Sequence, residues 1–532
     1  MTECPAARTE CPIASAIETA EAALACGQPF GDSDYIWRRL RLHYRSRLEM
    51  LDEHSRNAQD LLLVLDDMPE DRYRQVLGDP VVRVAVDGSV SYFRMNGELF
   101  PEDELEAALA IASTNAHNES WVPPLAEGSK DQIRVYDRRA WPWIWSSARV
   151  DDDPLGDCFR RLVSKHHRGL VLTTPDVPAQ KMLVAGAKVL HILCPRLAES
   201  AMSHVHLIAV VNTKSSVKVT SLTDPRIPGV FFLSPSVLTN PWQAAEYLLH
   251  EAMHLKFVDL ENTHSLFSED YDEVSSPKVR PHWNKIIPGG VSEWPIHRVL
   301  TVLHVYTCLA LFFTNAASRS SSLEAEYGPL HLDPIEQARR SFDRAHYLRY
   351  ELERHEEFLG FAGRLFIRWL GEILQSLDNS APPKGSYVHL LLDLYNRETD
   401  EIRTNVTALG DLVLPDDAKW GKFIRKVAKD EISRALVVLS MTSGAAAPAN
   451  RVLQNHDKLL QTLEASEARF SDSASTFLAV RNSIFQTLSS INSTAYLMPS
   501  LSSEMNTASE VVQTMVESSC SELRAVKKLI EA

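Results

Sequence analysis

The chain of 532 residues is too long for one hydrophobic core and predicts two to four domains or subdomains. Its 45% hydrophobic and 23% charged residues are typical of an ordinary folded protein. The formal net charge of -15 would repel a nucleic-acid backbone unless basic residues were gathered on one face. The sequence has no such basic block, which excludes nucleic acid as a partner.

The ends and the most apolar stretch indicate a cytoplasmic protein without a membrane span. The N-terminus carries several glutamates and lacks the basic-then-apolar order of a secretory signal. Residues 299–317 nearly have the length of a span but contain His304 and Asn315, so we expect a buried helix of a soluble core. The seven cysteines form no CxxC pair, which favours reduced thiols over disulfides or a cysteine-built zinc site.

In chain order, the hydrophobic spacing predicts an α+β fold that is predominantly α-helical. Residues 12–78 have helical spacing, and residues 81–100 alternate around Asp87-Gly88, which predicts a short β-hairpin. Strands are expected at 204–213, 218–222 and 229–235, and the chain is almost wholly helical from 240 onward. We therefore expect a zincin-like metal helix after a small β-sheet, followed by a large helical C-terminal region.

These changes of pattern divide the chain into five regions. Residues 441–450 are small, proline-containing and uncharged, which predicts a linker before the last region. Phe477, Val480, Ile484, Leu488 and Ile491 form a helical stripe, most simply the core face of a bundle and alternatively a partner-docking face. The regions are an N-terminal helical region (1–78), a mixed α/β region with a small sheet (79–235), the metal-site helices (236–330), a helical region (331–440) and a C-terminal bundle or docking segment (451–532).

The motif with the clearest chemistry is LLHEAMHLKF, residues 249–258. Asn240 and Pro241 suit the start of a helix, on which His250 and His254 project from one face and can hold one ion. Glu251 lies beside them, giving the pattern His-Glu-x-x-His. Imidazole suits both iron and zinc, so the motif alone does not choose between the two metals.

A working site needs a third protein ligand, and residues 292–313 offer candidates. Glu293, His297 and His304 are spaced to share one helical face. His304 lies in an apolar run and is the favoured third ligand, ahead of His297 and Glu293. The alternative is that His304 bonds a backbone carbonyl in the core.

The order of these segments resembles a known enzyme family over roughly residues 205–320. The segments are IPGVFFLSP, EYLLHEAMHLKF, PHWNKIIPGGVSEWP and RVLTVLHVYTCLALFF. Together they resemble the HExxH-type, 2-oxoglutarate-dependent peptide β-hydroxylases of ribosomal-peptide natural-product pathways. The resemblance implies that His250 and His254 bind iron(II), that 2-oxoglutarate and dioxygen are co-substrates, and that Glu251 orients a ligand or a bound water.

The sequence departs from that family in the loop before the third-ligand helix. The family usually shows Pro-Trp-Arg and a later Arg-Pro, whereas this chain has His282-Trp283-Asn284-Lys285 and Trp294-Pro295. The cation for the keto-acid carboxylate is therefore sought elsewhere. Arg298 is preferred over Arg280 and Lys285, because Arg298 shares the helix of His304 and can grip a carboxylate at two points.

Three functions follow as expectations. The first is a cytoplasmic, iron-dependent oxygenase that hydroxylates the β-carbon of an amino-acid residue in a peptide or carrier-bound substrate. The second is a zinc metallopeptidase in which Glu251 is the general base. The third is a non-catalytic helical binding protein. The substrate is the expected partner, and homo-oligomerisation is left open.

Overall fold

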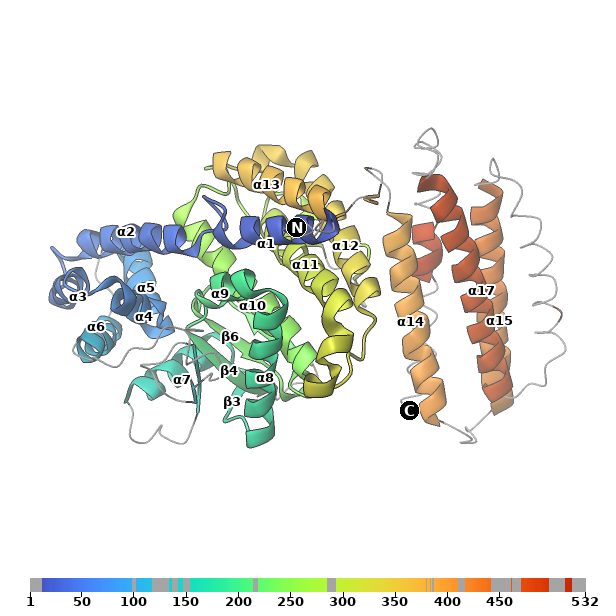
Figure 1. The fold of residues 1–532 in the computed structure, drawn as a ribbon, viewed down its shortest axis with the longest axis horizontal. Helices are drawn as coiled ribbons and strands as arrows, with labels where there is room; N and C mark the ends of the chain where they lie inside the picture. Colours follow the sequence, from blue (N-terminus) through green and yellow to red (C-terminus); the bar gives the residue numbers. More distant parts are fainter. Residues whose placement is uncertain are drawn as a thin grey trace, which may run out of the picture. The chain divides into compact units, whose positions relative to one another are not determined.

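The computed structural model describes most of the chain and divides it into two compact units. It describes residues 12–97, 102–116, 134–135, 142–146, 154–213, 219–284, 293–378, 380–382, 384, 387–409, 417–441, 461, 470–496 and 512–518. The first unit consists of residues 1–271, 300–345 and 356–379, and the second of residues 272–299, 346–355 and 380–532. The chain is predominantly helical with a small mixed sheet, as the hydrophobic spacing predicts (Figure 1).

The first unit begins with helices, continues through the sheet and ends with helices. The N-terminal helices are α1 (Pro12–Cys26), α2 (Ser33–Leu51), α3 (Arg56–Asp66), α4 (Glu70–Gly78), α5 (Pro80–Asn96) and α6 (Asp103–Ala116). Helices α7 (Pro154–His166), α8 (Val177–Leu193) and α9 (Pro195–Met202) alternate with the strands. After the sheet come α10 (Pro241–Thr263), most of α11 (Ile296–Tyr327), the first half of α12 (Pro334–Arg354), and α13 (Phe361–Leu377).

The sheet has the strand order β1-β2-β4-β6-β5, with β3 also paired to β4. Strands β1, β2, β4 and β6 are parallel, whereas β3 and β5 run antiparallel to their neighbours. The central strand β4 is buried from Leu207 to Val211, as a strand covered on both faces should be. The strands are β1 (Arg134–Val135), β2 (Trp143–Ile144), β3 (Leu170–Thr173), β4 (Leu207–Thr213), β5 (Ser221–Thr223) and β6 (Val230–Leu233).

The hairpin predicted at residues 81–100 is wrong, because Pro80–Asn96 forms helix α5. Asp79 caps this helix by accepting the N–H of Val81 at 2.9 Å, and Pro80 occupies the first turn. Its buried residues Val82, Val86 and Val90 recur every fourth position, so the valine-rich stretch fits a helix as well as a strand. Asp87-Gly88 is not a turn here, since Asp87 accepts hydrogen bonds from Tyr44 and Arg47.

A close contact with α8 fixes the position of helix α10. A Cβ on Gly186 of α8 would lie 2.7 Å from the Cβ of Ala244, so glycine lets α8 and α10 pack at short distance. α10 also packs against α2, α9, β5 and β6, and Figure 1 shows it beside α8 and α9. The sheet and these helices therefore enclose most of α10, whose side chains from Leu248 to Leu260 are largely buried.

Helix α11 is long and apolar enough to cross a membrane by length and composition. However, 89% of its most apolar window is buried inside the structure. This burial agrees with the expected core helix.

The second unit contains the short ribbon β7 (Lys278–Val279) with β8 (Trp294–Pro295) and the helices α14 (Val388–Leu409), α15 (Asp417–Met441) and α17 (Phe470–Tyr496). The predicted stripe is buried at Phe477, Val480, Ile484 and Leu488, where it packs with α14 and α15, so the bundle core is confirmed at these positions. Residues 442–450 of the expected linker and the side chain of Ile491 lie outside the described residues.

Candidate functional site

Helix α10 carries the His-Glu-x-x-His motif, and its start is the one predicted from the sequence. The side chain of Asn240 accepts the N–H groups of Trp242 at 2.7 Å and Gln243 at 3.4 Å, and Pro241 occupies the first turn. The helix begins soon after strand β6, which ends at Leu233. The strand, the cap and the helix thus confirm the local structure expected around the motif.

His250 and His254 lie together on one face of α10. Their Nε2 atoms are 3.2 Å apart, and the ring centroids are 5.0 Å apart. The side chain of His250 is 30% exposed, in contrast to the buried residues that surround the pair on the helix. The two imidazole nitrogens therefore converge at a point that solvent can reach.

Glu251 is buried and tied to the edge of the sheet. Its Oε2 accepts a 2.6 Å hydrogen bond from the hydroxyl of Thr223 on β5, and its Oε1 lies 3.9 Å from the Nε2 of His250. One turn earlier, the hydroxyl of Tyr247 bonds to Thr220, which precedes the same strand. These two contacts hold the first half of α10 against β5 and aim one carboxylate oxygen towards the histidine pair.

Glu246 stands one turn before His250, and the sequence analysis did not single it out. Burial raises the pKa of Glu246 to about 7, although the guanidinium groups of Arg340 and Arg344 on α12 act in the opposite direction. Arg344 donates to the hydroxyl of Tyr306 on α11 at 3.1 Å. A carboxyl group that titrates near neutrality thus shares the histidine-bearing side of α10 with two cations.

This group was missed because its members are far apart in the sequence. Glu246 precedes the arginines by more than ninety residues, and nothing in the local pattern around it differs from an ordinary exposed helix position. The spacing of four residues between Glu246 and His250 was the available signal, because it places both on one helical face.

His304, the favoured third ligand, lies in the apolar core. It is fully buried on α11, and its ring centroid is 5.2 Å from that of Phe366 and 6.4 Å from that of Trp369. Burial, together with the charges of Lys256 and His204, holds the pKa of His304 well below its usual range, so the ring is neutral. Lys256 projects from a different face of α10 than His250, since six residues turn a helix by about 240° and leave the two side chains about 120° apart.

Neither ring nitrogen of His304 has a hydrogen-bond partner among the described residues. The alternative, a hydrogen bond from His304 to a backbone carbonyl, is therefore absent from the contacts of the described residues. Within the same part of the chain, no group of three or more histidine, cysteine, aspartate or glutamate side chains is arranged to hold a metal ion. The identity of a third ligand stays a prediction.

The remaining sequence candidates belong to the second unit or lie outside the described residues. Glu293, His297 and Arg298 are in the second unit, where the Arg298 guanidinium lies 4.7 Å from the centroid of the Trp294 ring. Arg280 forms an ion pair with Glu517. Lys285 lies outside the described residues.

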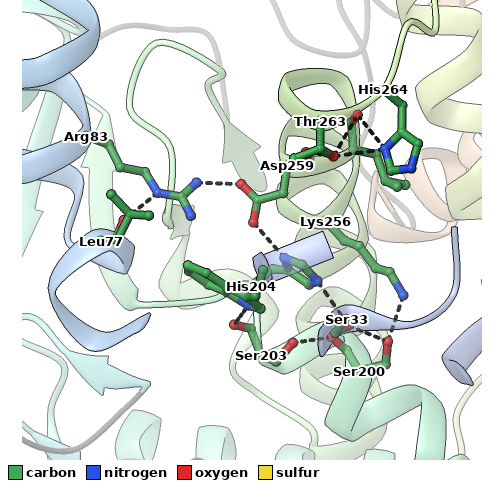
Figure 2. A network of polar contacts seen from close by, with 12 residues as sticks. Ser33, Leu77, Arg83, Ser200, Ser203, His204, Lys256, Asp259, Thr263 and His264 are labelled. Carbon is green, nitrogen blue, oxygen red and sulfur yellow. Dashed lines mark hydrogen bonds and ion pairs between the residues drawn. The ribbon is translucent and has the colours of Figure 1, made fainter. Parts of the chain in front are cut away.

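A second polar group lies on the buried side of α10 and links it to α2, α5 and α9 (Figure 2). The Nζ of Lys256 donates to the backbone oxygen of Gly31 at 2.6 Å and to the Oγ of Ser200 at 2.7 Å. Ser200 contacts Ser33 at 2.8 Å, and Ser33 lies 3.0 Å from the Nε2 of His204. We call these residues, with Asp259 and Arg83, the buried network.

Asp259 joins the two charged ends of the buried network. It lies 2.6 Å from the Nδ1 of His204 and 2.5 Å from the NH1 of Arg83. Burial alone would raise the pKa of Asp259, but the Arg83 and His204 contacts outweigh it and hold that pKa below its usual value. Each side chain of the network is at most 8% exposed, so the network ties helices together and does not meet solvent.

The chain was compared with known proteins. No protein-family model matches it, and no curated protein sequence matches it significantly.

Proposed function

We propose that the chain is an enzyme that binds one divalent metal ion through His250 and His254. The observation that carries this proposal is the 3.2 Å separation of their Nε2 atoms. Two nitrogens at about 2.1 Å from one ion, subtending roughly 90–110° at it, lie about 3.0–3.4 Å apart. The two imidazoles therefore fit two neighbouring coordination positions, and the exposure of His250 leaves the other positions open to a substrate or a further ligand.

We further propose that the metal is iron(II) and that the reaction is the 2-oxoglutarate-dependent hydroxylation of a β-carbon in a peptide or carrier-bound substrate. Iron(II) with the keto acid and dioxygen would supply the oxidising power, while the protein supplies binding and orientation. Two imidazoles with open neighbouring positions are a donor set that suits this metal. The resemblance over residues 205–320 supports the same choice.

In this proposal Glu251 positions a ligand or a bound water and is not the base of a hydrolytic reaction. Its Oε2 is held by Thr223, so its Oε1 keeps one orientation relative to His250. A hydrogen-bonded carboxylate beside a metal ligand commonly fixes the orientation of that ligand.

The carboxylates of 2-oxoglutarate need a cation, and the first unit offers Arg340 and Arg344. Both already act on the pKa of Glu246, one turn from His250. Arg298, preferred from the sequence, remains the alternative. Because the pKa of Glu246 is about 7, this residue can hold or release a proton near the histidine pair at neutral pH.

A zinc metallopeptidase is the second candidate, and one distance favours it. The Oε1 of Glu251 lies 3.9 Å from the Nε2 of His250, so it stands within reach of a water that would be bound to a metal ion held by His250. The two candidates use the same helix face and differ in the metal and in the role of Glu251.

Anaerobic reconstitution with iron(II), followed by a titration with 2-oxoglutarate, tests the proposal. We expect one iron per chain and a visible charge-transfer absorption that saturates with the keto acid. Tight zinc uptake without this absorption would support the peptidase. If the protein binds neither metal, the proposal is wrong and the non-catalytic helical binding protein is favoured. His250→Ala and His254→Ala should each lose the bound iron, whereas the exposed control His331→Ala should keep it.

A further inference from the structure

A groove on the first unit runs along one face of α2, away from the metal-site motif in the sequence. It has a volume of about 490 Å³. Helices α5 and α10 contribute its other wall, through Arg94 and through Asn262 and Thr263; Figure 1 shows where these helices lie. We call it the α2 groove, and its α2 residues are Arg39, Leu42, His43, Ser46, Arg47 and Met50.

The α2 groove is strongly basic in a chain whose net charge is -15. Arg39, Arg47 and Arg94 line it, and no described residue of its lining is acidic. Asp87 neutralises Arg47 from outside the lining at 2.6 Å. No described side chain forms a hydrogen bond or ion pair with Arg94, which is exposed. The groove therefore has an excess of positive charge that its surroundings do not fully compensate.

Two of these three arginines lie at helix ends, where a positive charge is favourable. Arg39 donates through its Nε to the backbone oxygen of Thr263, the last residue of α10, at 2.9 Å. Arg94 lies in the last turn of α5, where a cation is favourable. Arg47 is held by its ion pair with Asp87, and capping does not explain the exposed apolar side chains between the arginines.

Those apolar side chains make part of the groove surface hydrophobic. Leu42 is 66% exposed and Met50 is 36% exposed, and both line the groove. The lining residues of α2 run from Arg39 to Met50, which spans about 16 Å at a rise of about 1.5 Å per residue. A single phosphate would meet only one end of such a groove, whereas about five residues of extended polypeptide match its length.

We propose that the α2 groove binds an extended segment of another polypeptide that presents both acidic and apolar side chains on one face. The carboxylates of the segment would meet Arg39 and Arg94, and its apolar side chains would cover Leu42 and Met50. The charge complementarity of the groove and its length carry this inference, which does not depend on the chemistry at His250 and His254.

His43 offers an independent reporter inside the groove. Its Nε2 is buried and has no hydrogen-bond partner among the described residues. Burial, followed by the positive charges of Arg47, Arg83 and Arg94, lowers the pKa of His43 to about 4, against the opposite effect of Asp259. A carboxylate bound beside it should raise this pKa, because a nearby negative charge favours the protonated ring.

The experiment measures the fluorescence anisotropy of a labelled peptide whose extended form carries glutamate and leucine side chains on the same face, titrated with the full-length protein. Arg94→Gln should weaken binding about threefold, as expected for loss of one exposed ion pair, and Arg39→Gln/Arg94→Gln about tenfold. Arg38→Gln is the matched control, because Arg38 is an exposed arginine of α2 outside the lining, and it should bind as the wild type does. The His250→Ala/His254→Ala variant should also bind unchanged.

Two further measurements can overturn the proposal. A peptide with lysine in place of glutamate should not bind, and equal binding of both peptides would refute the role of charge. Inorganic phosphate should not displace the acidic peptide at low millimolar concentration. If phosphate alone displaces the peptide and shifts the NMR titration of His43, the groove takes a small anion and the polypeptide proposal is wrong.

Discussion

The hydroxyl of Thr223 lies 2.6 Å from the Oε2 of Glu251 and so couples the edge strand of the sheet to the motif helix. Glu251 itself is buried, so without Thr223 its Oε2 would have no hydrogen-bond partner in the described part of the chain. The orientation of the motif glutamate therefore depends on a strand that is separated from it by about thirty residues of sequence.

Thr223→Val should destabilise the protein by about 1–3 kcal/mol, because it leaves the Glu251 oxygen unsatisfied while keeping the shape of the side chain. Chemical denaturation followed by circular dichroism measures this change. Thr223→Ser is the matched control, since it keeps the hydroxyl, and it should recover most of the loss. Equal stability of the valine variant and the wild type would contradict the hydrogen bond.

Glu251→Gln separates the two proposed reactions. If Glu251 only orients a ligand, turnover should fall about 10–100-fold with iron still bound. If Glu251 is a general base of a peptidase, turnover should fall by a further factor of about ten or more, with zinc retained. Metal content measured on the same samples distinguishes a lost base from a lost metal.

Lys256 should give the protein a pH-dependent stability. Burial lowers the pKa of Lys256 from 10.5 to about 8, so between these values the unfolded chain binds more protons than the folded one. Stability then rises with pH through this window, and the cost of burying the charge, about 3 kcal/mol, is fully present below pH 8.

The measurement compares the unfolding free energy of the wild type and Lys256→Met from pH 7 to about pH 10.5. As the pH rises above 8, the unfolding free energy of the wild type should increase relative to that of Lys256→Met. The effects of the other titrating groups are common to both proteins and cancel in this difference. A difference that does not change with pH would show that Lys256 keeps its ordinary pKa.

Asp259→Ala should cost about 3–5 kcal/mol, because it leaves the buried Arg83 without its counter-ion. Urea unfolding measures this loss. Asp34→Ala is the control, since Asp34 pairs with Arg74 at a similar distance of 2.8 Å but is 67% exposed, and it should cost less than about 1 kcal/mol. Comparable losses in the two variants would contradict the importance of burial.

The bundle of the second unit should respond differently to single and double substitutions. Arg481 and Glu431 form a fully buried ion pair, and Glu431 also accepts from the Tyr395 hydroxyl at 2.8 Å. Glu431→Leu alone leaves a buried charge and should cost about 3–5 kcal/mol. Glu431→Leu/Arg481→Met should be more stable than that single variant, as thermal unfolding of the full chain can measure.

The parts of the fold that local chemistry decides could be predicted from the sequence. The Asn240 cap, the start of α10 and the apolar strands β4 and β6 follow from neighbouring residues alone. The stretch that forms α5 was mistaken for a hairpin, because its valines satisfy both spacings and the choice is made by the Asp79 cap and by packing on α2.

The surroundings of the motif could not be predicted in the same way. The apolar setting of His304 suggested a need for a partner, but packing against Phe366 and Trp369 involves a helix more than fifty residues later. The pKa of Glu246 and its two arginines likewise depend on how α10 and α12 pack. These contacts and charges depend on tertiary structure, which cannot be predicted from the spacing of residues within one helix.

The glycine contact between α8 and α10 limits how the motif helix can move. With the backbone of Ala245 only 2.9 Å from where a Gly186 Cβ would be, the crossing point of the two helices acts as a fixed pivot about one and a half turns before His250. Sliding of α10 along its axis would drive the Ala244 methyl into the α8 backbone. Any opening or closing around the imidazole pair must therefore come from side-chain rotation or from the neighbouring elements, with α10 itself as the stationary reference.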